Sequence, residues 1–387
     1  MTPGVALGVQ AAQSQTSAGR GLGRYVTDAS AAIVARVPGA VAQVSFSAEL
    51  APPAFLDQLP RSVPRGDDQT RPEWSGPLVY HVLSPLEVQP LDRVWPRWAR
   101  RPSVGLTVTV HDLIPFIFPA AYMDRPIVQR WHAPRLALLR IADALVVPSS
   151  ATAGDVIDRL GVDRSRIFVT GEDCGPTFRP AAEPREHLLA GLRRLVPGIR
   201  DGFLLFVGST EFRKNLDRLL AAYAKLAPSL RQEHQLVMAG KLGPGEENHL
   251  RVSLRQHRIE ADVLATGYIP DLTLARLYQL CDLFVFPSLY EGFGLPALEA
   301  MRCGARVLVA DASSLPELVR DPAARFDPRS VEAIRWALER GLTDEAFRAQ
   351  LQAMAAREAE RFSWDRATTE TLRAYGFALR RRVGLRR

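Results

Sequence analysis

The chain of 387 residues contains few lysines. Of its 49 basic residues only Lys214, Lys225 and Lys241 are lysines, so arginine supplies nearly all the positive charge behind the formal net charge of +7. Such an arginine bias is typical of a GC-rich genome, and a lysine at 214 indicates that a compact charge is needed there. The arginines are scattered, and no helix-turn-helix, zinc-finger or aromatic RNA-binding signature accompanies them, so we expect no nucleic-acid partner.

The chain also has few cysteines and no long apolar run. Cys174, Cys281 and Cys303 are far apart and form no Cys-x-x-Cys pair or His/Cys cluster, which favours a reducing compartment and argues against a structural zinc site. No stretch of about 18 apolar residues is present, so no membrane-spanning helix is predicted. The first residues lack the pattern of a secretory leader, and we therefore expect a cytoplasmic location.

Short apolar runs alternate with helical stretches in both halves of the chain. This pattern predicts parallel sheets covered on both faces, and two such units predict two Rossmann-like domains that face each other across a cleft. Residues 51–77 are expected to be irregular and residues 172–184 to form a hinge. The expected strands are 5–10, 78–82, 106–110, 144–147, 167–170, 203–207, 235–239, 263–265, 283–286 and 306–310. The expected helices are 24–37, 126–141, 216–227, 246–257, 271–280, 296–303, 331–339, 344–361 and 365–382.

The most informative segment joins a predicted strand at 283–286 to a predicted helix. Gly292 and Gly294 supply a tight turn between them, and Pro296 suits the first residue of the helix. A glycine turn before a helix N-terminus leaves backbone N–H groups accessible, which favours an anion.

Two carboxylates flank this turn, Glu291 before it and Glu299 in the expected first turn of the helix. Carboxylates repel phosphate but accept hydrogen bonds from hydroxyls. A ligand that carries both phosphates and sugars, such as a nucleotide sugar, fits this combination best.

A second strand and glycine turn precede the basic pair Arg213 and Lys214. The turn is formed by Gly208 and Ser209, and the following residues predict a helix whose start would meet a phosphate. The expected task of the two cations is to stabilise charge on a leaving diphosphate.

The two segments resemble the Glu-x7-Glu motif and the diphosphate loop of retaining glycosyltransferases of family 4, in particular mannosyl- and rhamnosyltransferase-like members. The resemblance spans nearly the whole chain but is dense only after residue 200, and Ser209 stands where many members have arginine. It implies the B-type glycosyltransferase fold, with an acceptor-binding domain at 1–180 that includes a returning helix at about 365–387, and a donor-binding domain at 181–364. Other matching segments are 236–241, 266–269, 314–317 and 362–364 and, more loosely, 21–25, 110–115 and 146–149.

The resemblance also implies roles for individual residues. Glu299 would accept hydrogen bonds from the ribose, Glu291 would contact hydroxyls of the transferred sugar, and His111 would contact the donor sugar near the reacting carbon; Asp112 beside it is expected only to cap the next turn. The residues expected to be catalytic are Arg213, Lys214, Glu291 and His111. Those expected to bind the donor are Gly21, Gly23, Gly208, Ser209, Tyr268, Ile269, Gly292, Phe293, Gly294, Leu295 and Glu299.

The implied reaction is the retaining transfer of a hexose or deoxyhexose from a nucleoside diphosphate sugar to a glycan, lipid-linked or natural-product acceptor. The family's front-face route is expected, in which the leaving phosphate oxygen takes the acceptor's proton. No metal cluster is apparent in the sequence, so neither a metal nor another cofactor is expected. The alternatives are a nucleotide-sugar epimerase, a non-catalytic nucleotide-sugar-binding partner and, more distantly, a nicotinamide dehydrogenase suggested by the glycines at 19–23.

A basic and aromatic segment predicts a surface that docks on anionic membrane and reaches a lipid-linked acceptor, although a solvated surface is an equal alternative. The location would then be peripheral, at the inner face of the membrane. The residues concerned are Trp95, Arg97, Trp98, Arg100 and Arg101, together with the terminal arginines 380–382, 386 and 387.

Overall fold

The structure is a computed structural model that describes residues 3–14, 21–86 and 89–383. The chain divides into two compact units, which are described separately. Unit 1 comprises the described residues of Met1–Asp173 and Phe362–Arg387, and unit 2 comprises Cys174–Arg361. The first division falls earlier in the chain than the predicted boundary at residue 180.

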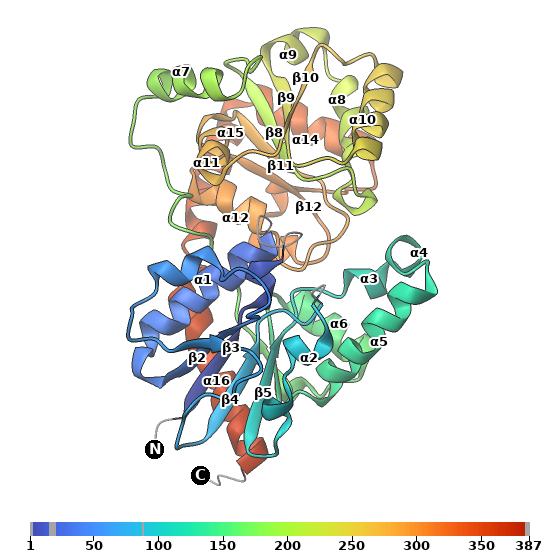
Figure 1. The fold of residues 1–387 in the computed structure, drawn as a ribbon. Helices are drawn as coiled ribbons and strands as arrows, with labels where there is room; N and C mark the ends of the chain where they lie inside the picture. Colours follow the sequence, from blue (N-terminus) through green and yellow to red (C-terminus); the bar gives the residue numbers. More distant parts are fainter. Residues whose placement is uncertain (1–2, 15–20, 87–88, 384–387) are drawn as a thin grey trace. The chain divides into compact units, whose positions relative to one another are not determined.

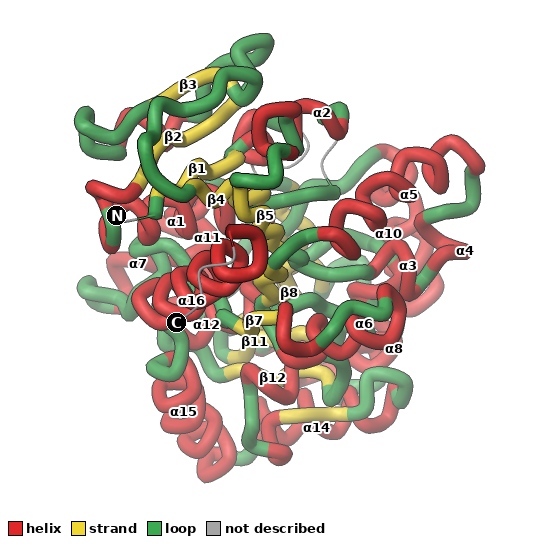
Figure 2. The backbone as a smooth tube through the Cα atoms, turned by 90° about the horizontal axis from the view of Figure 1, so that it is seen from below, coloured by secondary structure: helices red, strands yellow, loops and turns green. Residues whose placement is uncertain are grey.

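Unit 1 is built on a seven-stranded sheet in the order β3-β2-β1-β4-β5-β6-β7, and every neighbouring pair is parallel. Figure 2 shows β3, β2, β1, β4 and β5 following one another across this sheet. Its strands are β1 (Gly4–Gly8), β2 (Val41–Phe46), β3 (Arg65–Asp67), β4 (Leu78–Val82), β5 (Val104–Thr109), β6 (Ala144–Val147) and β7 (Ile167–Val169). Its helices are η1 (Gln10–Gln13), α1 (Gly21–Arg36), η2 (Pro38–Ala40), η3 (Ala54–Gln58), α2 (Leu91–Val94), η4 (Arg97–Arg100), α3 (Ile114–Ile117), α4 (Pro119–Tyr122), α5 (Pro126–Ile141), α6 (Ser150–Leu160), η5 (Arg164–Arg166) and α16 (Trp364–Val383).

Strands β2 and β3 were not predicted. The buried strand β2 contains Gln43 and Ser45, whose side chains are hydrogen-bonded to each other at 3.0 Å. These two polar residues interrupt the apolar pattern by which the other strands are recognised. Strand β3 lies within residues 51–77 and pairs with β2, so the prediction that this stretch is irregular was wrong for β3.

The last helix, α16, belongs to unit 1 and packs on its sheet (Figure 1). Tyr375 and Leu379 lie in the same core cluster as Leu7 and Tyr25. The helix packs directly against β5: a Cβ at Gly105 would lie 3.4 Å from the backbone of Ala378, which is van der Waals contact.

Unit 2 is built on a six-stranded parallel sheet in the order β10-β9-β8-β11-β12-β13. Its strands are β8 (Phe203–Val207), β9 (Gln235–Ala239), β10 (Val263–Gly267), β11 (Leu283–Phe286), β12 (Val307–Ala310) and β13 (Arg325–Phe326). Its helices are α7 (Arg185–Leu195), η6 (Phe212–Lys214), α8 (Leu216–Ala224), α9 (Pro228–Glu233), α10 (Pro244–His257), α11 (Asp271–Leu280), α12 (Leu295–Arg302), α13 (Leu315–Leu318), η7 (Pro322–Ala324), α14 (Val331–Thr343) and α15 (Glu345–Ala359).

Each sheet confirms the predicted Rossmann-like architecture and has one point at which the strand order reverses. In unit 1 this point lies between β1 and β4, and in unit 2 it lies between β8 and β11. Ligands of open α/β sheets bind outside the carboxyl ends of the strands at such points. Among the described residues, no helix is both long enough and apolar enough to cross a membrane.

Candidate active site

The loops after β8 and β11 meet at the reversal point of unit 2 and bring three predicted residues together. Lys214 Nζ donates to Glu291 Oε1 at 2.6 Å, and Arg213 Nη1 donates to Glu291 Oε2 at 3.0 Å. Both cations lie on η6, whereas Glu291 follows β11. Both oxygens of one carboxylate are thus held by two cations from the facing loop.

Glu291 and Lys214 are almost completely buried, and Arg213 Nε also donates to Glu211 Oε2 at 3.1 Å, so the two cations face two carboxylates. The side chain of Glu291 is 10% exposed and that of Lys214 is 12% exposed. Burial alone would raise the pKa of Glu291, but Lys214 and Arg213 outweigh it and hold this pKa below its ordinary value. Burial lowers the pKa of Lys214, an effect that Glu291 partly offsets and Arg213 reinforces. A bound diphosphate would compete with Glu291 and Glu211 for the two cations.

The third residue of the Arg-Lys-Asn segment, Asn215, fastens this loop to its neighbours. Its backbone is left-handed, with φ 61°, a conformation that asparagine tolerates better than most residues. Its buried amide Nδ2 donates to the carbonyls of Pro287 at 3.0 Å and Pro328 at 2.7 Å. The Leu289 amide also donates to the Arg213 carbonyl at 2.7 Å. Asn215 is therefore a structural residue that sets the position of the two cations.

The glycine turn between β11 and α12 is held by two serines that follow β12. Ser314 Oγ donates to the carbonyls of Glu291 at 3.0 Å and Phe293 at 2.9 Å, and the Glu291 amide donates to Ser313 Oγ at 2.9 Å. Gly294 has φ 109°, and a Cβ there would lie 2.6 Å from the side chain of Leu315. Sequence reasoning noted residues 314–317 only as a family match and missed their role in shaping this turn.

The loop that contains Ser209 is held by Glu246, which sequence reasoning also missed. Glu246 Oε1 accepts hydrogen bonds from the Thr210 amide at 3.3 Å and hydroxyl at 3.0 Å, while Oε2 accepts from the Gly243 amide at 2.8 Å. The acidic residue near the start of α10 is a signal for a helix cap, and here the same carboxylate also anchors the neighbouring loop.

Gly208, which was predicted to bind the donor, lies where its backbone passes close to the backbone of Ala239 and Gly240. Its amide donates to the Ala239 carbonyl at 3.0 Å, and a Cβ on Gly240 would lie 2.2 Å from the Gly208 carbonyl oxygen. The ends of β9 and β10 are joined in the same way, since the Gly240 amide donates to the Gly267 carbonyl at 3.1 Å. Tyr268 and Ile269 follow there, and the Tyr268 side chain is 63% exposed.

Glu299 lies deeper than the sequence suggests. It is the fifth residue of α12 and lies at the start of the second turn, so the prediction that it lies in the first helical turn was wrong. The residue is fully buried, and its Oε2 accepts a hydrogen bond from Tyr278 Oη at 3.0 Å. In this structure the carboxylate is not accessible to a ligand. The turn residues before it, from Gly292 to Gly294, are buried, and Leu295 is half-buried.

Two other predicted donor residues, Gly21 and Gly23, lie in unit 1. They were expected in a loop, but α1 already begins at Gly21 and Gly23 is buried within it. The preceding residues 15–20 lie outside the described part of the chain. The expectation of a glycine loop that ends at residue 23 was therefore wrong in its boundary.

His111 also lies in unit 1, just beyond β5. Its Nε2 is 2.9 Å from the Leu83 carbonyl oxygen, at the end of β4, and its Nδ1 is 3.8 Å from Glu172 Oε1. The ring of Tyr25 packs edge-on against the imidazole with centroids 4.5 Å apart. The neighbouring Asp112 caps the next turn, because its Oδ1 accepts from the Ile114 amide at 2.9 Å.

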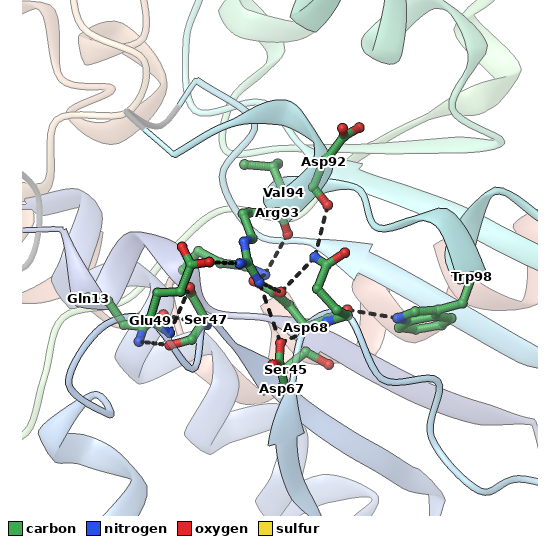
Figure 3. Close-up of polar contacts among 12 residues, drawn as sticks. Gln13, Ser45, Ser47, Glu49, Asp67, Asp68, Asp92, Arg93, Val94 and Trp98 are labelled. Atoms are coloured by element: carbon green, nitrogen blue, oxygen red, sulfur yellow. Dashed lines mark hydrogen bonds and ion pairs between the residues drawn. The ribbon is translucent and has the colours of Figure 1, made fainter.

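A second polar cluster in unit 1 lies where β1, β2 and β3 end (Figure 3). Asp68 is fully buried, and its Oδ1 lies 3.2 Å from Nη1 of Arg93, which is also paired with Glu49. Burial raises the pKa of Asp68. The carbonyl of Asp68 accepts a hydrogen bond from Trp98 Nε1 at 2.8 Å. This cluster ties Asp68, in the stretch 51–77 that was expected to be irregular, to Arg93 and Trp98 further along the chain.

The position of Trp98 corrects the predicted basic and aromatic surface. Trp98 is buried in the core against Tyr80, and Trp95 is half-buried beneath the guanidinium of Arg100 at 4.9 Å from its ring centroid. Arg100 is paired with Asp92. The two tryptophans therefore do not form an exposed patch.

The terminal arginines are also partly engaged. Arg382 Nε lies 2.6 Å from the buried Asp143 and Arg381 Nε lies 3.8 Å from it. Arg386 and Arg387 lie outside the described residues. The arginines of this helix end thus help to fasten α16 to its own unit.

No group of three or more His, Cys, Asp or Glu residues that could hold a metal ion occurs within the described ranges. The three cysteines are buried free thiols. Burial raises the pKa of Cys281 and raises the pKa of Cys303 to about 12, so neither thiol is suited to act as a nucleophile.

Comparison with known proteins identifies the family. The family model described as "Glycosyl transferases group 1" matches residues 197–358. The chain is 38% identical over 270 residues to the serotype-specific mannosyltransferase WbdA of Escherichia coli. The aligned region covers 69% of this chain but only 32% of that protein. The chain therefore spans about a third of the length of this relative.

A second relative matches over most of both chains. The O-antigen chain mannosyltransferase B of Escherichia coli is 31% identical over 341 residues, which cover 83% of this chain and 88% of that protein. Among solved structures, sucrose-phosphate synthase from Thermosynechococcus elongatus has the same fold, with a TM-score of 0.73 at 19% identity over 97% of this chain and 98% of that one. This chain therefore belongs to the group 1 glycosyl transferases.

Proposed function

We propose that this protein transfers a mannose-like hexose, with retention of configuration, from a nucleoside diphosphate sugar to a glycan acceptor. The observation that carries the proposal is the buried carboxylate of Glu291, held by Arg213 and Lys214 at the reversal point of the unit 2 sheet. The mannosyltransferase names of both Escherichia coli relatives support a mannose-like sugar.

The proposed chemistry follows from the charges of this cluster. A bound diphosphate would take Arg213 and Lys214 as its counterions, together with the backbone amides at the start of α12. Glu291 would then be free to accept hydrogen bonds from hydroxyls of the sugar. As the bond between the sugar and phosphate breaks, the two cations stabilise the developing negative charge, and the phosphate oxygen takes the acceptor's proton.

We expect no metal ion in this reaction, because the two side-chain cations occupy the position where a divalent ion would neutralise phosphate. Turnover that is unchanged by a chelator would support this expectation. Turnover that is lost with the chelator and restored by a divalent cation would contradict it.

The experiment that tests the function begins with thermal shifts in the presence of UDP, GDP, dTDP and their sugars. The stabilising donor is then incubated with and without mannose-containing acceptors, and the anomeric configuration of the product is read by NMR. We expect an α-linked product from an α-linked donor, and only with acceptor present. Release of an epimer or of free sugar without acceptor would favour the epimerase alternative. Binding with no transfer to any acceptor would favour a non-catalytic partner.

We also propose that the protein acts at the inner face of a membrane, through α16 rather than through the tryptophans. A groove of about 650 Å³ beside this helix is lined by arginines and apolar side chains. This combination suits an anionic lipid surface. The lining residues concerned are the arginines Arg36, Arg373 and Arg380 and the apolar residues Phe168, Leu372 and Phe377.

Sedimentation with vesicles tests this docking. We expect binding to vesicles that contain phosphatidylglycerol and loss of binding in an Arg373→Glu/Arg380→Glu variant. A matched Arg251→Glu/Arg255→Glu variant on α10 of unit 2 should bind as the wild type does. Equal binding to neutral phosphatidylcholine vesicles would overturn the proposed location.

A further inference from the structure

His111 has a partner that no motif indicated. The carboxylate of Glu172 follows β7 and lies 3.8 Å from His111 Nδ1, within ion-pair range. Glu172 is 7% exposed. The residue before it, Gly171, has φ 68°, a left-handed conformation that turns the chain at this point. A buried carboxylate beside an imidazole is costly unless the pair is charged.

The opposite ring nitrogen settles which atom carries hydrogen. Nε2 of His111 is 2.9 Å from the Leu83 carbonyl oxygen, and a carbonyl can only accept a hydrogen bond. Nε2 must therefore carry a hydrogen. In a neutral ring Nδ1 would then present a lone pair toward the carboxylate of Glu172, which is repulsive. A protonated ring presents N–H to both acceptors, so the geometry favours an imidazolium.

The other groups around His111 do not compete for this charge. His81 is fully buried, and burial followed by the charge of His111 lowers its pKa to about 3, so it stays neutral. Its ring nitrogens lie 2.7 Å from Tyr375 Oη and 2.9 Å from Thr109 Oγ1. Burial raises the pKa of Tyr25 well above its ordinary value, and Tyr25 also stays neutral.

The acidic groups that face His111 act in the same direction. Burial alone would lower the pKa of His111, but its contact with Glu172 and the more distant charge of Asp112 raise this pKa above its ordinary value. Among these acids, Glu172 exerts the larger effect.

We propose that Glu172 is a positioning residue that holds His111 as a cation in a fixed orientation. The inference rests on the proposed sugar transfer. Because both ring nitrogens carry hydrogen, His111 cannot take the acceptor's proton. The bond from the sugar carbon to phosphate breaks, the bond from that carbon to the acceptor oxygen forms, and the proton passes to the leaving phosphate. His111 would then act as a fixed positive charge and not as a base.

The first test measures His111 itself and needs no turnover. In the full chain labelled with ¹⁵N-histidine, NMR titration gives the His111 pKa, and a His111→Gln variant assigns its signals. Glu172→Gln keeps the size of the side chain and removes its charge. We expect it to lower the His111 pKa by about one unit or more. Glu183→Gln, at an exposed position further along the chain, should leave it unchanged. An unchanged His111 pKa in Glu172→Gln would overturn the proposal.

The second test measures whether sugar transfer depends on the positive charge of His111. Wild-type kcat should fall as the pH rises through the His111 pKa, because the imidazolium is lost. In Glu172→Gln this fall should move to lower pH, with kcat near neutrality reduced about tenfold and the KM for donor little changed; Glu172→Asp should restore part of kcat. A shifted His111 pKa with wild-type kcat would overturn the positioning role. A wild-type protein that transfers no sugar would instead refute the proposed function, while the titration still decides whether Glu172 holds the charge.

Discussion

In both units the candidate functional side chains lie beyond the carboxyl ends of sheet strands, but their neighbours hold them in different ways. In unit 2, Arg213 and Lys214 are neighbours in sequence and meet Glu291 from the adjacent central strand through direct ion pairs. In unit 1, His111 is surrounded by Tyr25 and Glu172, which come from α1 and from the segment after β7. One cluster is built from two short loops and the other from three distant segments.

This difference explains why the second half of the sequence is so much easier to interpret. Binding a diphosphate at a strand end requires a glycine turn, cations and a helix start at fixed spacing, so the required residues lie close together in the sequence. Holding an imidazole requires only an acceptor on each side, and any segment that folds nearby can supply it. The first kind of site appears as a motif, and the second kind does not.

Replacement of Lys214 should have the largest effect on the unit 2 cluster. Lys214→Ala removes the cation that lies 2.6 Å from Glu291, and we expect turnover to fall roughly 100- to 1,000-fold. Lys225→Ala is the matched control, because Lys225 is exposed and paired with Glu332. Steady-state transfer assays check both variants. Wild-type turnover in Lys214→Ala would remove Lys214 from the active site.

Replacement of Asn215 should affect the stability of unit 2 and leave unit 1 unchanged. Asn215→Ala removes two buried hydrogen bonds and places alanine at φ 61°, which together cost about 3 kcal/mol. Calorimetry should show an earlier transition for unit 2. Asn248→Ala on the exposed face of α10 should change stability by less than about 0.5 kcal/mol. Equal losses in the two variants would contradict the structural role assigned to Asn215.

Loss of Glu299 should weaken nucleotide binding. If its carboxylate binds the ribose, Glu299→Ala should raise the Kd for the nucleoside diphosphate about 10- to 100-fold. Isothermal titration checks this, with Glu345→Ala at the exposed start of α15 as the control. Tyr278→Phe, which removes only the hydroxyl that contacts Glu299, should have a much smaller effect on Kd. Unaltered affinity in Glu299→Ala would show that the buried carboxylate is purely structural.

Neutralising Glu291 should have the smallest effect on binding, and in the opposite direction. Glu291→Gln removes the carboxylate that both Arg213 and Lys214 contact, while Arg213 keeps its pair with Glu211, so the nucleoside diphosphate should bind roughly 3- to 10-fold more tightly. Sugar transfer should nevertheless fall, since the glutamine amide accepts hydrogen bonds from the sugar hydroxyls more weakly than the carboxylate does. Titration and turnover measured on the same preparation separate the two effects. Weaker binding in this variant would mean that Glu291 does not compete with the diphosphate.

Much of the fold could be predicted because buried parallel strands are short apolar runs with clear boundaries. The strand Leu283–Phe286 and the helix Asp271–Leu280 match their predicted bounds, as does Pro126–Ile141 in unit 1. β2 was missed because two of its buried residues are polar, and their hydrogen bonds are visible only once the neighbouring strand is in place. Trp98 was misplaced because a tryptophan among arginines has the same sequence signature whether it lies inside or outside.

By itself the sequence determined the family of this protein: residues 197–358, which contain the cation pair, the two glutamates and their glycine turns, match the group 1 glycosyl transferases. Those features are local, since backbone conformation and charge at a strand end depend on adjacent residues. Only the tertiary structure decided that Glu291 sits between two cations, that Glu246 and Ser314 hold the loops, and that Glu172 faces His111. Such contacts join residues far apart in the chain, and their distances are set by the packing of a whole unit.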